Sequence, residues 1–190
     1  MSPSAVTAIL EQHQALGAVL RSFRLQVERT RHSGTPPDFG TLRAMLFYLD
    51  EVPAQLHHAK ESTYLFPRLR ERCPPLRPVL DRLEAEHTRG EIAIRELERA
   101  LLAFEVMGEP RRAAFEAAAE RYVSTYIGHM EVEEDYVIPV ALDCLTASDW
   151  AELDEAFSVD RDPAERDIAE ACRELLRRVL FQGSLPSFCR

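Results

Sequence analysis

The chain has 190 residues, a length that suits a single domain with one substantial core. Hydrophobic residues make up 46% of it and only 7 residues are glycine, a composition typical of a helix-rich globular protein and not of a disordered or fibrous one. Because 32 acidic side chains outnumber 23 basic ones, the formal net charge of −9 argues against nucleic acid as a partner. No apolar run approaches the ~18 residues of a membrane span, which argues against a membrane protein.

Helical periodicity begins after Ser4. Apolar residues recur with the 3.6-residue spacing of an amphipathic helix up to a loop that contains Gly34, which predicts a first helix over about residues 4–32. The same spacing resumes after Asp38, a residue type that caps helices. It predicts a second helix over about residues 38–66, with a short continuation beyond the bend at Pro67.

Two further long helices and a helical tail follow. The third helix is predicted from Leu76 to Gly108, and Pro110 stands where a first-turn proline would open a fourth helix that runs to about Val140. The tail predicts a helix near residues 147–157 and another that begins at Asp162. Since long helices with short connections pack as antiparallel neighbours, the expected fold is all-α: an antiparallel, up-down-up-down four-helix bundle over residues 1–144, with a short helical C-terminal extension over residues 145–190 packed on it.

Two stretches of the chain repeat one another. HHAKESTYLFP (57–67) and HMEVEEDYVIP (129–139) share a histidine at the start, a glutamate four residues later, then a tyrosine and a proline at matching positions. Upstream, His13 precedes His57 by 44 residues and His87 precedes His129 by 42. Each half of the chain therefore carries one helix with a histidine and one helix with His-x-x-x-Glu.

The repeated residues have the chemistry of metal ligands. A histidine and a glutamate four residues apart lie one turn apart on the same helix face, so both can reach one ion. If the two halves face each other, imidazoles and carboxylates converge at mid-bundle, and the candidate metal ligands are His13, His57, Glu61, His87, His129 and Glu133. Imidazole and carboxylate without thiolate favour iron or manganese. We expect two iron ions bridged by the glutamates, with manganese or zinc as substitutes.

This combined motif, with the Leu-Phe-Pro and Val-Ile-Pro that follow the two His-x-x-x-Glu segments, resembles the hemerythrin-like (HHE cation-binding) family over about residues 5–142. The resemblance implies an antiparallel four-helix bundle around a non-haem di-iron centre, bridged by carboxylates and by an oxo or hydroxo group. It also implies a small diatomic molecule or a peroxide as the ligand of the centre.

The chain departs from the oxygen-carrying members of that family at two positions. Those proteins have His-x-x-x-His in the third helix and His-x-x-x-x-Asp in the fourth, whereas this chain has Glu91 and Glu134 there. The fifth imidazole is thus missing, which weakens the case for reversible oxygen carriage. Glu91 shares a helix face with His87 and is a candidate ligand or base, while Glu134 is expected outside the direct ligands. The pattern is closer to di-iron proteins that repair iron–sulfur clusters, although those usually carry an additional cysteine-bearing domain that this sequence does not contain.

The sequence also predicts where several other polar residues lie. His58 is rotated by about 100° from His57 and is expected on the surface or as a support for a ligand. His32 is expected in a loop, exposed to solvent. Tyr64 and Tyr136 each lie three residues after a candidate ligand, so the phenol either hydrogen-bonds a bridging carboxylate or belongs to the aromatic core.

Four widely spaced cysteines form neither a zinc pattern nor a disulfide framework, and no signal peptide is evident, so a reducing, cytoplasmic location is expected. They are Cys73, Cys144, Cys172 and Cys189.

The leading functional hypothesis is a di-iron protein whose centre binds or reacts with oxygen, peroxide or nitric oxide. The alternatives are an iron- or redox-responsive sensor or iron-holding module without turnover, a protein related to iron–sulfur cluster repair, and a metal-free interaction domain. Whether the chain is an enzyme, and whether it forms a homodimer, stay open.

Overall fold

A computed structural model describes residues 3–33, 36–52 and 57–158, together with four isolated positions at 170, 174, 175 and 177. All the regular structure in these residues is helical, which confirms the predicted all-α class. Helix α1 spans Ser4–Ser33, close to the predicted first helix. Helix α2 spans Phe39–Val52 and is preceded by Asp38, whose carboxylate accepts a hydrogen bond from the Thr41 backbone N–H at 3.1 Å, as a helix cap does.

Within its described residues, the predicted second helix is not a single regular α-helix. From His57 onward the chain forms α3 (His58–Lys60), a π-helical turn (Glu61–Leu65) and α4 (Phe66–Arg72). The π-helical turn ends two residues before Pro67, which has no backbone N–H to donate to the preceding turn. The prediction of one helix over residues 38–66 was therefore too simple.

The second half of the chain repeats this arrangement. Helix α5 (Arg77–Met107) ends at Gly108, whose φ of 71° favours glycine. Helix α6 (Arg112–Val132) is followed by a π-helical turn (Glu133–Val137) and by α7 (Ile138–Cys144). Here too a proline, Pro139, lies in the first turn of the helix that follows the π-helical turn. Both π-helical turns thus begin at the glutamate of a His-x-x-x-Glu segment.

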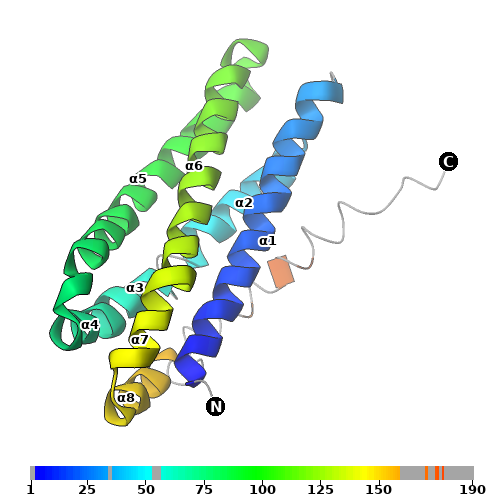
Figure 1. The fold of residues 1–190 in the computed structure, drawn as a ribbon. Coiled ribbons are helices and arrows are strands. Elements are labelled where there is room, and N and C mark those ends of the chain that lie inside the picture. The colour runs from blue at the N-terminus through cyan, green and yellow to red at the C-terminus, as the bar shows by residue number, and fades with distance from the viewer. Residues whose placement is uncertain are drawn as a thin grey trace.

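The long helices form the predicted up-down-up-down bundle (Figure 1). Helix α1 packs against α2 and α6, and α5 packs against α2 and α6, so the four helices close a ring around a shared interior. Helix α8 (Ala147–Phe157), which matches the predicted tail helix, packs against α1 at the lower end of the bundle in Figure 1. The helix expected from Asp162 and most of the extension lie outside the described residues, so the division at residue 144 stays a prediction.

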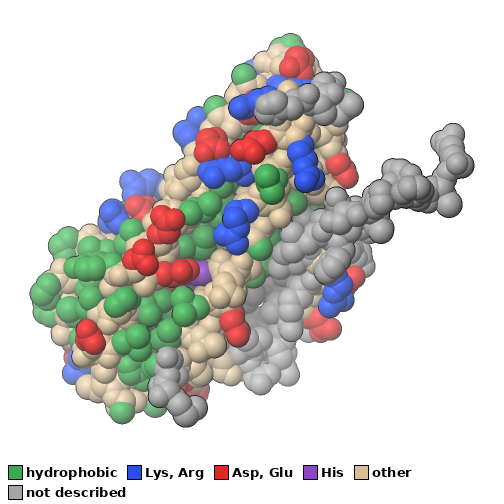
Figure 2. Space-filling model, turned by 45° about the vertical axis from the view of Figure 1, so that its right-hand side comes forward, with side chains coloured by type: hydrophobic (Ala, Val, Ile, Leu, Met, Phe, Trp, Pro, Cys, Tyr) green, Lys and Arg blue, Asp and Glu red, His purple; other side chains and the backbone are tan. Residues whose placement is uncertain are grey.

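The apolar core consists of two separate clusters. The upper cluster has its fully buried members within residues 16–27, 42–49, 94–104 and 115–130. The lower cluster has its own within residues 5–9, 65–69, 76–83 and 137–157, at the end where Figure 1 shows α4, α7 and α8. Between the two clusters along the helices lie the six candidate ligands. On the face drawn in Figure 2, hydrophobic side chains gather over the lower half, and a histidine shows at the surface beside acidic side chains.

Candidate metal centre

The six candidate ligands come together from four helices, and all are buried. The exposed fraction is 5% or less for each of His13, His57, Glu61, His87, His129 and Glu133. They form two groups whose ligand atoms all lie within 4.8 Å of one another, and each group contains both glutamates. The first group adds His13 and His57, and the second adds His87 and His129. The sequence repeat is thus reproduced as two matched sets of nitrogen and oxygen atoms.

Each glutamate spans both groups with separate oxygen atoms. Glu61 has Oε1 at 3.4 Å from Nε2 of His57 and Oε2 at 3.6 Å from Nε2 of His87. Glu133 has Oε2 at 3.3 Å from Nε2 of His13 and Oε1 at 3.1 Å from Nε2 of His129. Donor atoms about 2.1 Å from a common ion lie about 3.0–3.4 Å apart, so these distances fit ligands of two ions joined by two carboxylates.

The outer nitrogen of each imidazole contacts an oxygen from a neighbouring helix. His13 Nδ1 donates to Glu134 at 2.8 Å, and His129 Nδ1 donates to Glu86 at 3.0 Å, since a carboxylate accepts. His57 Nδ1 lies 2.9 Å from the Gln12 amide oxygen, and His87 Nδ1 lies 3.2 Å from the Ser62 hydroxyl. Such partners orient a ligating imidazole and fix which nitrogen carries the proton.

The inner nitrogens face one another in two close pairs. Nε2 of His13 lies 2.9 Å from Nε2 of His57, and Nε2 of His87 lies 3.1 Å from Nε2 of His129. When Nδ1 carries the proton, Nε2 presents a lone pair, and two lone pairs at this distance repel each other unless a cation lies near both. Three buried carboxylate oxygens, Glu61 Oε2 and both oxygens of Glu133, have no hydrogen-bond partner either. The donor set fits cations, and it lacks internal partners of its own.

The electrostatics of these six residues agree with this assignment. Burial, and then the neighbouring His13, lower the pKa of His57 to about 3, and burial and His129 lower the pKa of His87 to about 4. Both imidazoles are therefore neutral at pH 7, the form that ligates metal. Burial and the adjacent Glu133 raise the pKa of Glu61 well above its usual range. Burial acts in the same direction on Glu133, but the neighbouring imidazoles of His129 and His13 lower its pKa well below its usual range.

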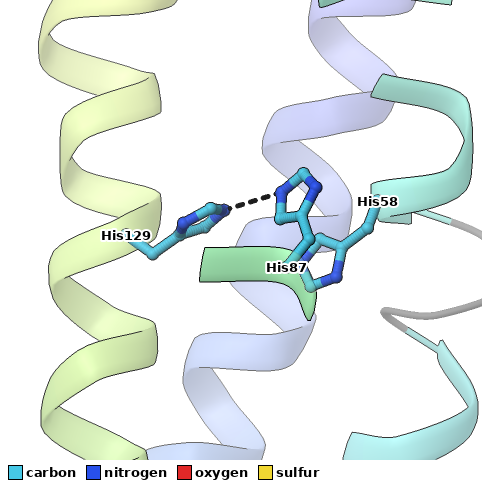
Figure 3. A group of neighbouring side chains, drawn as sticks. All are labelled: His58, His87 and His129. Carbon is cyan, nitrogen blue, oxygen red and sulfur yellow. Dashed lines mark hydrogen bonds between the residues drawn. The ribbon is translucent and has the colours of Figure 1, made fainter. Parts of the chain in front are cut away.

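His58 is buried, so of its two expected positions the surface was wrong, and the contact with a candidate ligand is the one that the structure fits. Its exposed fraction is 7%, and its ring stacks on that of His87 with centroids 3.9 Å apart. Figure 3 shows His58, His87 and His129 converging from α3, α5 and α6, and one nitrogen of each lies within 4.8 Å of the others. Nε2 of His58 lies 2.8 Å from the Tyr126 hydroxyl. Tyr126 was missed in the sequence, although it lies three residues before His129 on the same helix face.

The two repeated tyrosines lie away from the centre. Tyr64 is 41% exposed and Tyr136 is 50% exposed, so neither the ligand-contact nor the core prediction was right. The π-helical turns explain this result. A turn closed over five residues instead of four rotates each residue by less than 100°, and this moves the tyrosine further from the face of the preceding glutamate.

The remaining predicted neighbours are also located. Glu91 is exposed on α5 and belongs to neither of the two ligand groups. Glu134 holds the outer nitrogen of His13, as described above, and is likewise outside the groups. His32 belongs to the last turn of α1 and not to a loop, while its side chain lies outside the described part of the structure. Gln12, Ser62 and Glu86 were not predicted, although each is the sequence neighbour of a candidate ligand.

Comparison with protein families now gives the fold and centre a context. The sequence matches the hemerythrin HHE cation-binding domain over residues 4–141, which is most of the chain. The chain belongs to the hemerythrin family. A comparison with curated proteins gave no match. The match begins and ends with the bundle, from the first turn of α1 to the middle of α7.

Membership of the hemerythrin family implies that the chain binds a metal cation. The two His/Glu groups are where the described structure offers such a cation its ligands. Within the described helices, none combines the length and apolar character that a membrane span requires.

Proposed function

We propose that this hemerythrin-family chain holds two iron ions and that the resulting centre binds or reacts with oxygen, peroxide or nitric oxide. His13 and His57 hold one ion, His87 and His129 hold the other, and Glu61 and Glu133 bridge the two. Iron in such a centre supplies one-electron exchange with small oxygen or nitrogen species. Manganese and zinc are the expected substitutes, and the cytoplasm is the proposed location.

The observation that carries this proposal is the pair of short Nε2–Nε2 contacts, at 2.9 Å and 3.1 Å, between imidazoles whose outer nitrogens contact oxygen acceptors. Each glutamate has one carboxylate oxygen near a histidine of the first group and the other oxygen near a histidine of the second group. This arrangement supports two ions and not one. Two-metal sites hold their ions about 3.5–4 Å apart, a separation that a carboxylate bridges with its two oxygens.

Reaction with a small molecule is supported by the side of the centre at His87 and His129. Carriers in this family place a further imidazole there from the third helix, whereas Glu91 is exposed and lies outside the donor groups. The two imidazoles on that side also line a cavity between α5 and α6. This chain's own residues thus hold the imidazoles in place from the outside and leave one side of the centre accessible.

The division of the core favours a second candidate, an iron-holding module without turnover. The donor residues separate the upper and lower apolar clusters, so bound metal would join the two parts of the bundle and its loss would loosen them. Addition of hydrogen peroxide or nitric oxide to the reduced protein under anaerobic conditions separates the two candidates. A change in the electronic spectrum supports reaction, and stoichiometric iron with no spectral change supports the holding module.

The ligand assignment is tested by elemental analysis of freshly purified variants. His57→Ala and Glu133→Ala are each expected to lose at least one ion per chain, because each removes a ligand of a bridged pair. Glu131→Ala is the matched control, since Glu131 is exposed two residues from Glu133 on the same helix. Retention of both ions in either ligand variant would contradict the assignment.

A further inference from the structure

A cavity of about 640 Å³ lies between α5 and α6 and ends at the metal centre. Its inner end is formed by three histidines, His58, His87 and His129, which Figure 3 shows converging on one another. His13 and His57 do not line it, and their exposed fractions are 2% and 0%. The cavity therefore approaches the centre from the His87 and His129 side.

The cavity is much larger than a diatomic molecule requires, and it is long. Its lining residues on α5 extend from Glu86 to Ala100, and those on α6 extend from Ala114 to His129. At 1.5 Å of rise per residue, each of these stretches is about 21–23 Å long. Pockets of roughly 300–1,000 Å³ are the size class that binds organic ligands. An extended organic molecule fits these dimensions.

The lining has an apolar interior and a charged rim. Small residues on both helices keep the space open: Gly90, Ala93, Ala100, Ala114 and Ala118. The aromatic side chains of Tyr122 and Tyr126, both buried, form part of the wall. The exposed side chains of Arg89, Glu96 and Arg121 stand at the rim and carry both signs of charge. An aliphatic chain would lie along these walls without leaving buried polar groups unpaired.

The inner end has the opposite character. His58, His87, His129 and the Tyr126 hydroxyl bring polar atoms to one end of the cavity, beside the proposed position of one metal ion. A buried carboxylate needs a cation or several hydrogen-bond donors, and the proposed metal ion beside His87 and His129 would supply a cation at the inner end of this cavity. An oxygen-donor head group is therefore favoured there, with the aliphatic chain directed away from the centre.

We propose that this cavity binds a medium- to long-chain carboxylic acid, with the chain along α5 and α6 and the carboxylate at the His58, His87 and His129 end. The position of the carboxylate rests on the proposed metal centre, whereas the position of the aliphatic chain does not. The protein is in this way a receptor for an extended organic acid and not for a diatomic molecule alone.

Calorimetric titration of the full chain tests the chain-binding part, first without metal. Hexanoate, octanoate and decanoate are expected to bind one per chain, with affinity rising about fourfold for each added methylene group that enters the cavity. Ala118→Phe fills the cavity and should weaken decanoate binding about tenfold or more, because the ring displaces at least two methylene groups. Ala117→Phe, exposed and outside the lining, should bind as the unaltered protein does.

A second blocking variant guards against misfolding of Ala118→Phe. Thr125 is exposed and lines the cavity, so Thr125→Trp should retain the helical circular dichroism spectrum and still weaken binding. Equal binding by both blocking variants and by the unaltered protein would show attachment to the surface and would overturn the inference. Failure of all three acids to bind the unaltered protein would overturn it as well.

The carboxylate is tested by a comparison of decanoate with 1-decanol, which has the same chain length. Decanoate should gain affinity when the protein is loaded with ferrous iron, whereas 1-decanol should bind alike with and without metal. No gain for decanoate in a protein that analysis shows to hold iron would overturn the proposed orientation. A protein that takes up no metal would instead contradict the proposed function, and the chain-length series would still decide whether the cavity binds aliphatic chains.

Discussion

At the centre, each imidazole has two different contacts, and the residues that make them follow the sequence repeat. Gln12 and Glu86 directly precede the histidines of α1 and α5, and they hold the imidazoles of His57 and His129. Ser62 and Glu134 directly follow, in sequence, the two glutamates that belong to both ligand groups. They hold the remaining two histidines. The duplication thus includes the residues that orient the ligands as well as the ligands themselves.

Substitution of Glu86 tests whether this orientation matters for metal binding. Glu86→Ala removes the acceptor at 3.0 Å from His129 Nδ1, so the ring can rotate and its other nitrogen can take the proton. Loss of such a partner typically weakens metal affinity about 10–100-fold, and we expect a weakening in this range, measured by competition with a chelator. Glu91→Ala serves as the control on the same helix, because Glu91 is exposed. A larger loss for Glu91→Ala than for Glu86→Ala would make Glu91 the ligand.

Substitution of Glu61, one of the two buried glutamates, should affect stability and metal binding in opposite directions. Without metal, burial and the nearby Glu133 raise the pKa of Glu61 well above its usual range, because two buried carboxylates resist simultaneous ionisation. Glu61→Gln removes this repulsion. The variant should therefore unfold at the same or a higher temperature than the unaltered protein when both are metal-free, and it should bind fewer ions when metal is supplied.

Thermal unfolding in chelator, paired with elemental analysis, measures both effects of Glu61→Gln. Glu131→Gln is the exposed control and should change neither the unfolding temperature nor the number of ions. A metal-free Glu61→Gln variant that is clearly less stable than the metal-free unaltered protein would show that Glu61 stabilises the fold by itself and is not primarily a ligand.

At the scale of the elements, helix positions followed from periodicity, whereas two local features did not. The bounds of α1, α5 and α8 lie within a residue or two of the predicted ranges, since apolar spacing and the turn residues Gly108 and Pro110 mark them. The π-helical turns were not predicted, because an ideal helix was assumed through each His-x-x-x-Glu segment. The burial of His58 was missed for a related reason: helical angle alone does not show which neighbouring helix covers that side.

Helix α8 is fixed at its beginning by a small polar cluster. Thr146 caps the helix, and the Asp149 carboxylate accepts a hydrogen bond from the Thr146 backbone N–H at 2.9 Å. Asp149 also accepts two hydrogen bonds from the Arg72 guanidinium of α4, at 3.0 Å and 3.1 Å. Hydrogen bonds from Arg72, and then from Thr146, hold the pKa of Asp149 well below its usual range. The ionised carboxylate therefore connects α8 to α4.

Asp149→Ala should lower the free energy of unfolding by about 1–2 kcal/mol at pH 7, because it removes the acceptor of the hydrogen bonds from Arg72 and from the Thr146 backbone N–H. Because the pKa of Asp149 is lowered in the folded protein, its contribution is present above the unfolded pKa of about 3.9 and is lost as the pH falls below it. Urea unfolding at pH 7 and pH 3 measures the difference. Glu155→Ala, exposed on the same helix, should have little effect at either pH. A destabilisation by Asp149→Ala that increases on acidification would contradict this account.

In the whole molecule, the donor residues form a polar layer across the bundle. The upper and lower apolar clusters lie on either side of it, and all four long helical regions contribute to both clusters. A metal-free layer leaves opposed nitrogens and unpartnered carboxylate oxygens between two well-packed regions. Two bound cations would replace those unfavourable contacts with ligand bonds. The free energy of unfolding of the whole bundle should therefore depend strongly on bound metal, even though each apolar cluster is well packed.

Removal of metal should accordingly destabilise the polar layer between the two apolar clusters first. A ligand present at about 100 times its dissociation constant stabilises the folded state by about 2.7 kcal/mol, and in a chain of this size each kcal/mol corresponds to about 2–4 °C. Chelation should therefore lower the unfolding temperature by roughly 5–10 °C for each tightly held ion. Hydrogen exchange should rise first in the π-helical turns that begin at Glu61 and Glu133, because these lie in the polar layer. His57→Ala, which should lack an ion from the start, should respond less to chelator than Glu131→Ala does. Faster exchange confined to the bundle ends, with the π-helical turns unchanged, would mean that metal does not hold the two clusters together.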